Sequence, residues 1–334
     1  MTGATVPRRR PGLPDSGSMI QVLRRNSWSV SLLGLLLAVL AFTKLIQPSY
    51  GAAELQDLAR GALPLALAAV AQAIVVISGG IDLSVGPMMA LASVVAASQM
   101  EGRSEEYGVV VVLGVLLLGL VLGAINGTLI VVSKVPDIVV TLAMAFVWAG
   151  CALLVLDSPG GGSALWLKAI VNGSLGTEWL PRAFVFLVLA VGIIWIPLRR
   201  SRTGISLYAI GSDRLAAFRS GVPVGRTKIL AYSLTGLFSA LGGLALTGYT
   251  GIGAPVPGNY TLLGVAAIVL GGVSLAGGRG GIVGPIIAVL ILSIIRSDLT
   301  FLNVNPNLAT VVQGLILIGV VMLGSLITLR RERR

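Results

Sequence analysis

Long apolar segments follow one another along most of the chain, and short polar segments separate them. Each is close to the roughly 20 residues that a helix needs to cross about 30 Å of hydrocarbon. Strands of a membrane barrel would alternate apolar and polar residues, which these segments do not do. Because lipid admits only helices or closed barrels, the pattern predicts an all-α integral membrane protein. We expect about ten transmembrane helices, at residues 28–46, 61–78, 83–99, 109–132, 137–156, 183–198, 229–248, 260–275, 281–295 and 308–328.

Three of these segments, the second, the eighth and the ninth, are short or are interrupted by Gly and Pro. Interrupted segments of this kind are typical of the discontinuous helices of transporters. We therefore expect these three helices to be broken or tilted.

Composition agrees with a protein that lies mostly in lipid. Of the 334 residues, 55% are hydrophobic and 11% are charged, whereas a soluble domain carries about 25% charged residues. The chain has no histidine, which removes the usual general base and the commonest metal ligand. Cys151 is the only cysteine, so neither an internal disulfide nor a cysteine metal site is expected.

The chain lacks the sequence signatures of ATP hydrolysis and of hydrolytic catalysis. It has no GxxxxGK(S/T) motif, and the glycine-rich residues 277–281 join two apolar segments instead of a strand and a helix. A Ser/His/Asp or Cys/His set is impossible without histidine. We therefore expect no enzymatic activity, cofactor or metal site in this chain.

Lys and Arg are distributed unevenly between the two sides of the expected membrane domain. With an even number of spans and a cytoplasmic N-terminus, most of the 24 Lys and Arg residues fall on the cytoplasmic side. The positive-inside rule therefore favours cytoplasmic N- and C-termini. The same bias explains the net charge of +11 without nucleic acid as a partner. Residues 1–26 are expected to form a disordered basic cytoplasmic tail, residues 27–329 the membrane domain, and residues 330–334 a second basic cytoplasmic tail.

One long polar segment, residues 199–228, interrupts the apolar pattern near the middle of the chain. A membrane protein with one large basic loop is expected to meet a soluble partner there. The alternative is an amphipathic loop that anionic lipid headgroups hold at the membrane surface.

A short helix is expected within this loop. Ser212 or Asp213 can accept hydrogen bonds from its first N–H groups, and about two turns follow from residue 214. Gly221 suits the left-handed position after a helix, and Pro223 stops further winding. Apolar contact would come from Leu215, Ala217 and Phe218, and charge from Arg214 and Arg219.

A second informative segment, residues 78–86, reads SGGIDLSVG and joins two apolar segments. Gly79 and Gly80 permit a sharp reversal of the backbone. Asp82 or Ser84 can cap the helix that follows. The segment is therefore either a well-capped turn between helices or a place where a transported solute makes contact.

The full SGGIDLSVG string closely resembles the signature of the permease subunits of ABC importers for ribose and related sugars, the monosaccharide or branched-chain-type permease family. Residues 202–204 and 207–211 are similar to the start of that family's cytoplasmic loop. Residues 268–284 are similar to its late GGxSLxGGxG segment, and the resemblance covers about residues 61–326.

The resemblance implies a type II ABC importer-like bundle in a bacterial inner membrane, paired with a second copy or a homologous permease. It also implies that residues 199–228 hold a coupling helix that seats in a cleft of a separate ATP-binding subunit. An extracytoplasmic solute-binding protein would deliver a ribose-like monosaccharide or a similar small polar solute. The residues implied to couple the chain to the ATPase are Asp213, Arg214, Ala216, Ala217, Phe218, Arg219 and Gly221.

The sequence departs from the family pattern at two places. Residues 261–264 read TLLG where many members carry acidic residues, and Asp137 follows Pro136 where an apolar aromatic residue is usual. Both places lie in or near segments that could line the path. These changes leave the identity of the sugar open, and they leave open a dimer with a different permease that restores the missing acids.

Polar residues inside the apolar segments are candidates for the solute path, although most such residues in membrane bundles bond neighbouring helices instead. We find no carboxylate at the middle of a segment, which argues against a carrier driven by protons or sodium. An ATP-independent channel or facilitator and a secondary carrier remain the alternatives. The path candidates are Gln72, Asn126, Thr141, Trp148, Thr247 and Gln313, together with the turn residues Gly79, Gly80, Asp82 and Ser84.

Overall fold

The computed structural model describes residues 27–256, 258–305, 307–312, 314–315, 318–319 and 322. Within them the chain is almost entirely helical, with one small hairpin. The elements are α2 (Ser27–Ile46), α3 (Ala52–Ile77), α4 (Val85–Met100), α5 (Glu105–Ser133), α6 (Asp137–Val155), α7 (Leu165–Val171), β1 (Ser174–Leu175), β2 (Thr177–Pro181), α8 (Arg182–Arg200), α9 (Arg202–Ser212), α10 (Arg214–Arg219), α11 (Val224–Thr250), α12 (Tyr260–Leu270) and α13 (Val283–Phe301).

Seven of the described helices are long and apolar enough to cross a membrane, namely α2, α3, α5, α6, α8, α11 and α13. The shorter apolar helices α4 and α12 account for two more of the expected segments. Residues 307–312, at the start of the expected tenth helix, are helical, and most of that helix lies outside the described residues. The expected tails at residues 1–26 and 330–334 also lie outside them.

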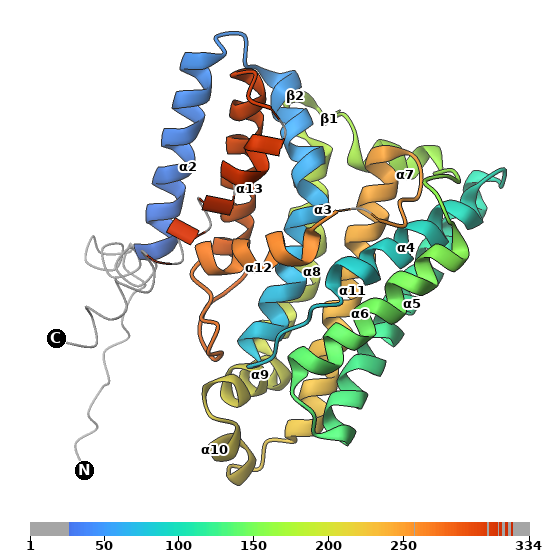
Figure 1. Cartoon of the computed structure of the whole chain (residues 1–334), viewed down its shortest axis with the longest axis vertical. Helices are drawn as coiled ribbons and strands as arrows, with labels where there is room; N and C mark the ends of the chain where they lie inside the picture. Colours follow the sequence, from blue (N-terminus) through green and yellow to red (C-terminus); the bar gives the residue numbers. More distant parts are fainter. Residues whose placement is uncertain are drawn as a thin grey trace, which may run out of the picture.

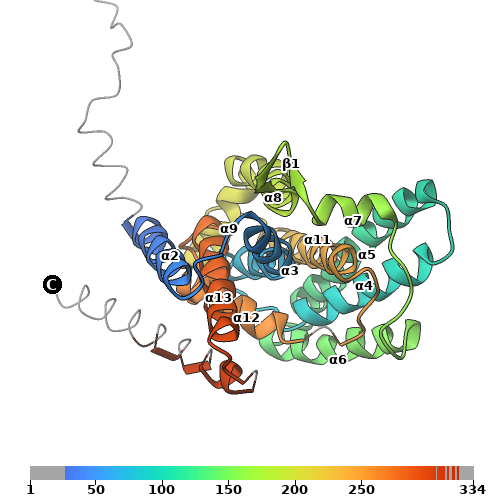
Figure 2. The ribbon, with the colours of Figure 1, turned by 90° about the horizontal axis from the view of Figure 1, so that it is seen from above.

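Helices α3 and α11 form the centre of the bundle, and the other long helices surround them (Figure 1, Figure 2). Almost every residue of α3 after its first turns is buried, and many of them are Ala. Small side chains let neighbouring helix backbones come close, which supplies the packing that lipid cannot drive. By contrast, most side chains of α2 and α6 face outward.

A glycine stripe on α5 brings it into backbone contact with α11. Gly119, Gly123 and Gly127 are spaced four residues apart, so they lie on one face of the helix. A Cβ atom at Gly123 would overlap the carbonyl oxygen of Tyr232, and one at Gly119 would overlap that of Gly236. This small-residue spacing is a known device of tight membrane helix pairs, and it makes α5–α11 the most extensive helix interface described.

The helical pattern is broken between α3 and α4. Helix α3 runs to one end of the bundle, and residues 78–84 then turn back into the bundle without helical structure. Helix α4 starts from this segment, near mid-height (Figure 1). Non-helical backbone is tolerated at such depth only where protein surrounds it.

The second, eighth and ninth helices were expected to be broken or tilted, and α3 and α13 contain no break. Helix α3 is continuous over 26 residues, because Pro64 is accommodated within it, and α13 is continuous over 19. The eighth helix is short, since α12 ends after 11 residues at Leu270. A glycine-rich turn follows it, in which Gly277, Gly278 and Gly280 have positive φ angles.

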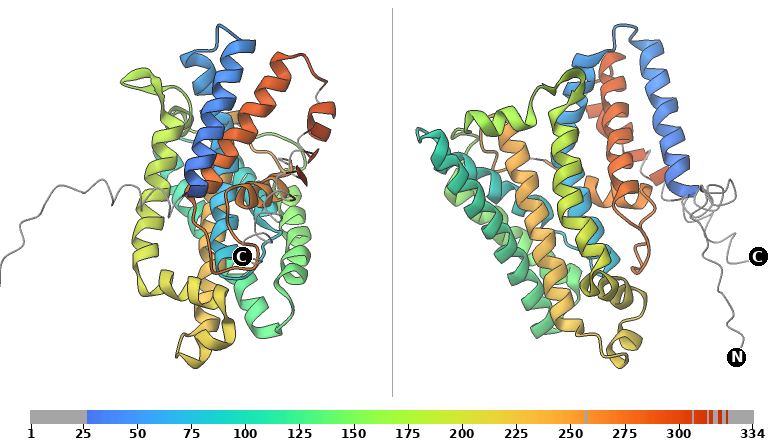
Figure 3. Two further views of the ribbon diagram at one scale, coloured as in Figure 1. Left: turned by 90° about the vertical axis from the view of Figure 1, so that its left-hand side faces the viewer. Right: turned by 180° about the vertical axis from the view of Figure 1, so that it is seen from behind.

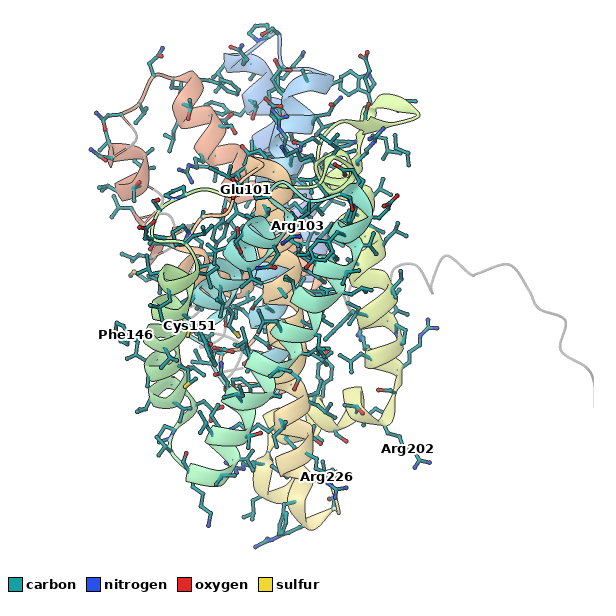
Figure 4. All side chains as sticks on the ribbon, turned by 90° about the vertical axis from the view of Figure 1, so that its right-hand side faces the viewer. Glu101, Arg103, Phe146, Cys151, Arg202 and Arg226 are labelled. Carbon is teal, nitrogen blue, oxygen red and sulfur yellow. The ribbon has the colours of Figure 1, made fainter. Side chains whose placement is uncertain are left out.

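The connections at the two ends of the bundle differ in character. Helices α9 and α10 lie at one end, whereas α7 and the β1–β2 hairpin lie at the other (Figure 3). Arg202 and Arg226 lie at the first end, and Glu101 and Arg103 lie toward the second (Figure 4). Helix α9 was not expected as a separate helix, and it shows that much of the polar loop at residues 199–228 is ordered helix.

Candidate functional site

The non-helical segment at residues 78–84 is held by side chains from several helices. The N–H of Leu83 donates to Thr141 Oγ1 at 3.1 Å, and Thr141 Oγ1 lies 3.2 Å from the carbonyl oxygen of Ile81. The carbonyl of Asp82 accepts a hydrogen bond of 2.7 Å from Gln72 Nε2 on α3. Side chains therefore satisfy backbone groups that a helix would satisfy internally.

A chain of buried polar side chains continues from this segment through the bundle. Asp82 Oδ1 accepts hydrogen bonds from the N–H and the hydroxyl of Ser84, at 2.8 and 2.6 Å. Asn126 Nδ2 on α5 donates to Ser84 Oγ at 2.8 Å, and Trp148 Nε1 on α6 lies 3.3 Å from Asn126 Oδ1. Gln72, Asp82, Ser84 and Asn126 are fully buried. Five of the ten expected path and turn residues thus form one cluster, which we call the polar chain: Gln72, Asp82, Ser84, Asn126 and Trp148.

Two oxygens of the polar chain have no hydrogen-bond partner among the described residues. They are Asp82 Oδ2 and Gln72 Oε1, both fully buried. An unpaired buried acceptor carries an uncompensated desolvation cost of about 1–3 kcal/mol, and more for a charged group. The polar chain can therefore accept hydrogen bonds from a polar ligand that enters the bundle.

The expected capping of α4 by Asp82 or Ser84 is wrong. Ser84 occupies the N-cap position, but its side chain makes no capping bond, and Asp82 binds Ser84 itself instead of the helix. Thr261 on α12 supplies a cap from a distance, because its Oγ1 accepts a hydrogen bond of 2.8 Å from the N–H of Gly86. The hydrogen bond gives Thr261 a structural role in holding the start of α4.

Thr247 lies apart from the polar chain, whereas Thr141 borders it, because Thr141 bonds the backbone of Leu83 and Ile81 on either side of Asp82. Thr247 on α11 pairs with Ser93 on α4 at 2.9 Å, which fits a helix–helix bond. Gln313 lies outside the described residues. Gly79 has a φ of +80°, as a sharp reversal requires, and it lies against the backbone of Gly211 at the end of α9.

Gly80 packs against a cluster of charged and polar groups that sequence reasoning missed. Lys228 Nζ binds Asp137 Oδ1 at 2.7 Å, and the hydroxyl of Tyr232 donates to Asp137 Oδ2 at 2.7 Å. A Cβ at Gly80 would lie 2.6 Å from Asp137 Oδ2 and 2.7 Å from the hydroxyl of Tyr232. Spacing held a signal, since Lys228 and Tyr232 are four residues apart on α11 and lie on one face. Asp137 is therefore not a free acid facing the path.

A cleft of about 450 Å³ opens where these elements meet. Its walls come from the turn at residues 78–81, the Asp137–Lys228 pair, and the junction of α9 and α10. Beside this cleft, Tyr208 joins α9 to the glycine-rich turn after α12, because its hydroxyl donates a hydrogen bond of 2.8 Å to the carbonyl of Gly280. Burial raises the pKa of the Tyr208 hydroxyl, which favours its protonated, hydrogen-bond-donating form.

The expected short helix in the polar loop is present as α10, and Asp213 caps it. Asp213 Oδ1 accepts hydrogen bonds of 2.9 Å from the N–H groups of Leu215 and Ala216. Gly221 has a φ of +81° and follows the helix, as its sequence position indicates. Leu215 and Phe218 are 57% and 67% exposed, whereas Ala217 is buried against the chain itself. Ala217 therefore packs internally and is not free to contact a partner, contrary to expectation.

A family comparison identifies the chain. The model for the permease component of branched-chain amino acid transport systems matches residues 55–321. The chain belongs to this family. The resemblance seen in the glycine-rich signature is thus confirmed over most of the membrane domain.

Named relatives of this permease family cover most of the chain. It is 37% identical over 262 residues to the ribose import permease protein of Bacillus subtilis (strain 168), covering 75% of this chain and 77% of the relative. It is 33% identical over 262 residues to the ribose import permease protein of Escherichia coli (strain K12), covering 77% and 81%. The fructose import permease protein of Rhizobium meliloti is 31% identical over 307 residues, covering 89% and 84%. No solved structure matches the chain significantly.

Membership of this permease family settles the class of the protein. The chain is a multi-pass inner-membrane permease subunit of an ABC importer and is not an enzyme, and ATP hydrolysis belongs to a separate subunit. A permease of this class works with an ATP-binding subunit and a solute-binding protein.

Proposed function

We propose that the chain forms the transmembrane path of an ATP-driven importer for a monosaccharide or a chemically similar small polar solute. Relatives of the chain include import permeases for ribose, fructose and, at 32% identity, galactose and methyl galactoside. The polar chain offers amide, hydroxyl, carboxylate and indole groups within an apolar bundle. A few convergent polar groups with an aromatic face suit the hydroxyls and the ring of a sugar.

We propose that an ATP-binding subunit docks on the exposed face of α10, which includes Leu215 and Phe218. Helix α10 projects at one end of the bundle, beyond the long apolar helices (Figure 3). A groove beside it is lined by Leu215 and Phe218 and by Val131 from the end of α5, and Arg214 and Arg226 border it. Exposed apolar side chains with Arg at the rim are typical of a protein–protein interface. We assign α10 as the coupling helix.

The orientation follows from the same end of the bundle. Arg202 and Arg226 lie there, and of the two ends of α2, its first residues lie nearer this end. By the positive-inside rule we place this end, and with it both termini, in the cytoplasm. The solute-binding protein would then meet the opposite end, which carries α7, the hairpin and the acidic side chain of Glu101.

We further propose that the importer holds two permease chains, either two copies of this chain or one copy and a homologue. The long helices carry outward apolar side chains that lipid and a second permease chain would cover, including Phe146, which is 74% exposed and points away from the bundle (Figure 4). Four of the five side chains of the polar chain have no exposed surface, so a solute reaches them only after the helices move. Closure of the ATP-binding subunits on α10 supplies that movement.

Purification of the tagged chain in mild detergent from its own cells tests the docking assignment. A protein with an ATP-binding motif is expected to co-purify with the wild type and to be lost from Phe218→Asp. Trp179→Asp is the matched control, because Trp179 is an exposed aromatic residue at the opposite end, in β2. Loss of the ATP-binding protein from both variants, or retention in both, would contradict the assignment of α10.

Uptake into proteoliposomes tests the importer itself. Radiolabelled ribose is expected to accumulate only when the ATP-binding subunit, the solute-binding protein and ATP are present, with galactose and fructose as competitors. ATP-independent uptake by the chain alone would replace the importer with a facilitator. Uptake that follows a proton or sodium gradient would replace it with a secondary carrier.

A further inference from the structure

The carboxylate of Asp137 joins two helices that are distant in sequence. Asp137 is the first residue of α6, and both of its oxygens accept hydrogen bonds from α11. Lys228 Nζ and the Tyr232 hydroxyl each lie 2.7 Å from the carboxylate, and the side chains of the Asp137–Lys228 pair are only 14% and 10% exposed. Water therefore screens this ion pair weakly, and its geometry is fixed at both oxygens.

On one side, this pair is connected to α10 through a short, well-packed link. The N–H of Val222 binds the carbonyl of Ala217, so the chain leaves α10 in a fixed direction. Ala217 and Val224 form a small apolar cluster with Ile210 of α9. Lys228 lies one turn after Val224 on the same helix. These contacts join α10 firmly to the start of α11, so we expect a displacement of α10 to move Lys228 as well.

On the other side, the pair is connected to the non-helical segment that begins the polar chain. Thr141, one turn after Asp137 on α6, contacts the N–H of Leu83 and the carbonyl of Ile81. The Tyr232 hydroxyl also lies 3.4 Å from the carbonyl of Ile81. The segment is thus held between α6 and α11 at the point where the carboxylate binds them together.

We propose that Asp137 and Lys228, with Tyr232, are positioning residues that transmit the movement of α10 to residues 81–83 and so couple ATP use to the opening of the polar chain. The pair borders the 450 Å³ cleft, so α6 and α11 have space to shift at this end. With the pair intact, α6 follows α11 and pulls the segment with it. Without it, α11 moves while α6 and the segment stay behind. This inference rests on the proposed function for its transport readout.

Hydrogen–deuterium exchange on the full chain in lipid nanodiscs tests the structural half of the proposal. Asp137→Asn and Lys228→Met are expected to raise exchange at least several-fold in residues 78–84 and 134–141. Peptides from the interiors of α3 and α11 should keep wild-type exchange, which separates local release from misfolding. Unchanged exchange at residues 78–84 in both variants would overturn the proposal.

The transport half is tested with the complete importer in proteoliposomes, where ATP hydrolysis and ribose uptake are measured in the same vesicles. We expect ribose imported per ATP to fall about tenfold or more in Asp137→Asn and Lys228→Met, with hydrolysis within about threefold of wild type. Lys228→Arg, which keeps the charge, should recover most of the coupling. The matched control is Asp57→Asn, which breaks the exposed ion pair of Asp57 with Arg60 at the other end and should leave the ratio unchanged.

Failure of the proposed importer function and failure of the proposed coupling role of Asp137 and Lys228 give different results. If the wild type imports none of ribose, galactose and fructose with its partners and ATP, the proposed function fails, while the exchange experiment still decides the structural tie. If the wild type imports ribose and both variants keep its ratio of uptake to hydrolysis, the proposed function stands and the coupling role of Asp137 and Lys228 is wrong.

Discussion

Replacement of Gly123 by Ala is expected to damage the bundle through one methyl group. The added Cβ would overlap the carbonyl oxygen of Tyr232 and would lie 2.9 Å from Cα of Ser233. Both neighbours belong to the backbone of α11, so neither can rotate away as a side chain would. The two helices must separate by roughly 1 Å to reach an ordinary contact, and interiors packed at crystal density resist such a shift.

The magnitude follows from two opposing terms. Overpacking a well-packed core costs about 1–3 kcal/mol, whereas Gly→Ala within a helix gains about 0.5–1 kcal/mol. Gly114 lies on the same helix, and no atom lies within 4 Å of the place that an added methyl group would occupy, so Gly114→Ala measures the helical gain alone. The difference between the two variants isolates the packing cost, for which we expect about 1–3 kcal/mol.

Thermal unfolding of both variants in the same nanodiscs measures this difference. At about 2–4 °C per kcal/mol, as for domains of 150–250 residues, Gly123→Ala should unfold at least about 2 °C below Gly114→Ala. It should also lower ribose uptake, because separation of α5 from α11 moves Asn126 away from Ser84. Equal unfolding temperatures would refute the backbone contact between α5 and α11.

Three further substitutions address single contacts. Asp213→Ala removes the cap of α10 at a cost of about 1 kcal/mol and should weaken binding of the ATP-binding subunit in a pull-down, whereas Asp213→Asn should retain it. Thr261→Val leaves the N–H of Gly86 without its acceptor and should cost about 1–3 kcal/mol in thermal unfolding, and Thr261→Ser should restore the stability. Trp148→Phe removes the indole donor to Asn126 and should lower the free energy of unfolding by about 0.5–1.5 kcal/mol. It should also lower ribose uptake clearly, although the protein remains folded at the assay temperature.

The sequence was sufficient for the elements that depend on local rules. Apolar length predicted the long helices, and the residues around Asp213 and Gly221 predicted α10 with both of its ends. Caps and stops are properties of a few neighbouring residues, so they can be read without the fold. The glycine-rich string at residues 78–86 indicated the family for the same reason.

What the sequence could not supply was the pairing of distant positions. The N–H of Gly86 is bonded by Thr261, which is 175 positions away in the sequence, and Lys228 pairs with Asp137, which is 91 positions away. Lys228 read as one more basic residue of a cytoplasmic loop, because its partner is decided by how α6 lies against α11. The expectation that Ala217 faces a partner failed similarly, since the side of α10 that is exposed depends on where α9 packs.

The proposed function requires a well-packed bundle to open for a solute, and the non-helical segment at residues 78–84 is the part of the core best suited to this. Backbone groups of a helix are bonded in one ladder and move together. The N–H groups of residues 78–80 still bond to carbonyls of α3, whereas the backbone groups of residues 81–83 are bonded one at a time to Gln72 and Thr141. Single side-chain bonds can be exchanged for bonds to a polar ligand without unwinding a helix. The unpaired oxygens of Asp82 and Gln72 lie at this same place, so the non-helical part of the core also offers free hydrogen-bond acceptors to a polar ligand. A segment continuous with α3 would have satisfied its own backbone, and it would have left the bundle no interior position for a polar ligand to occupy.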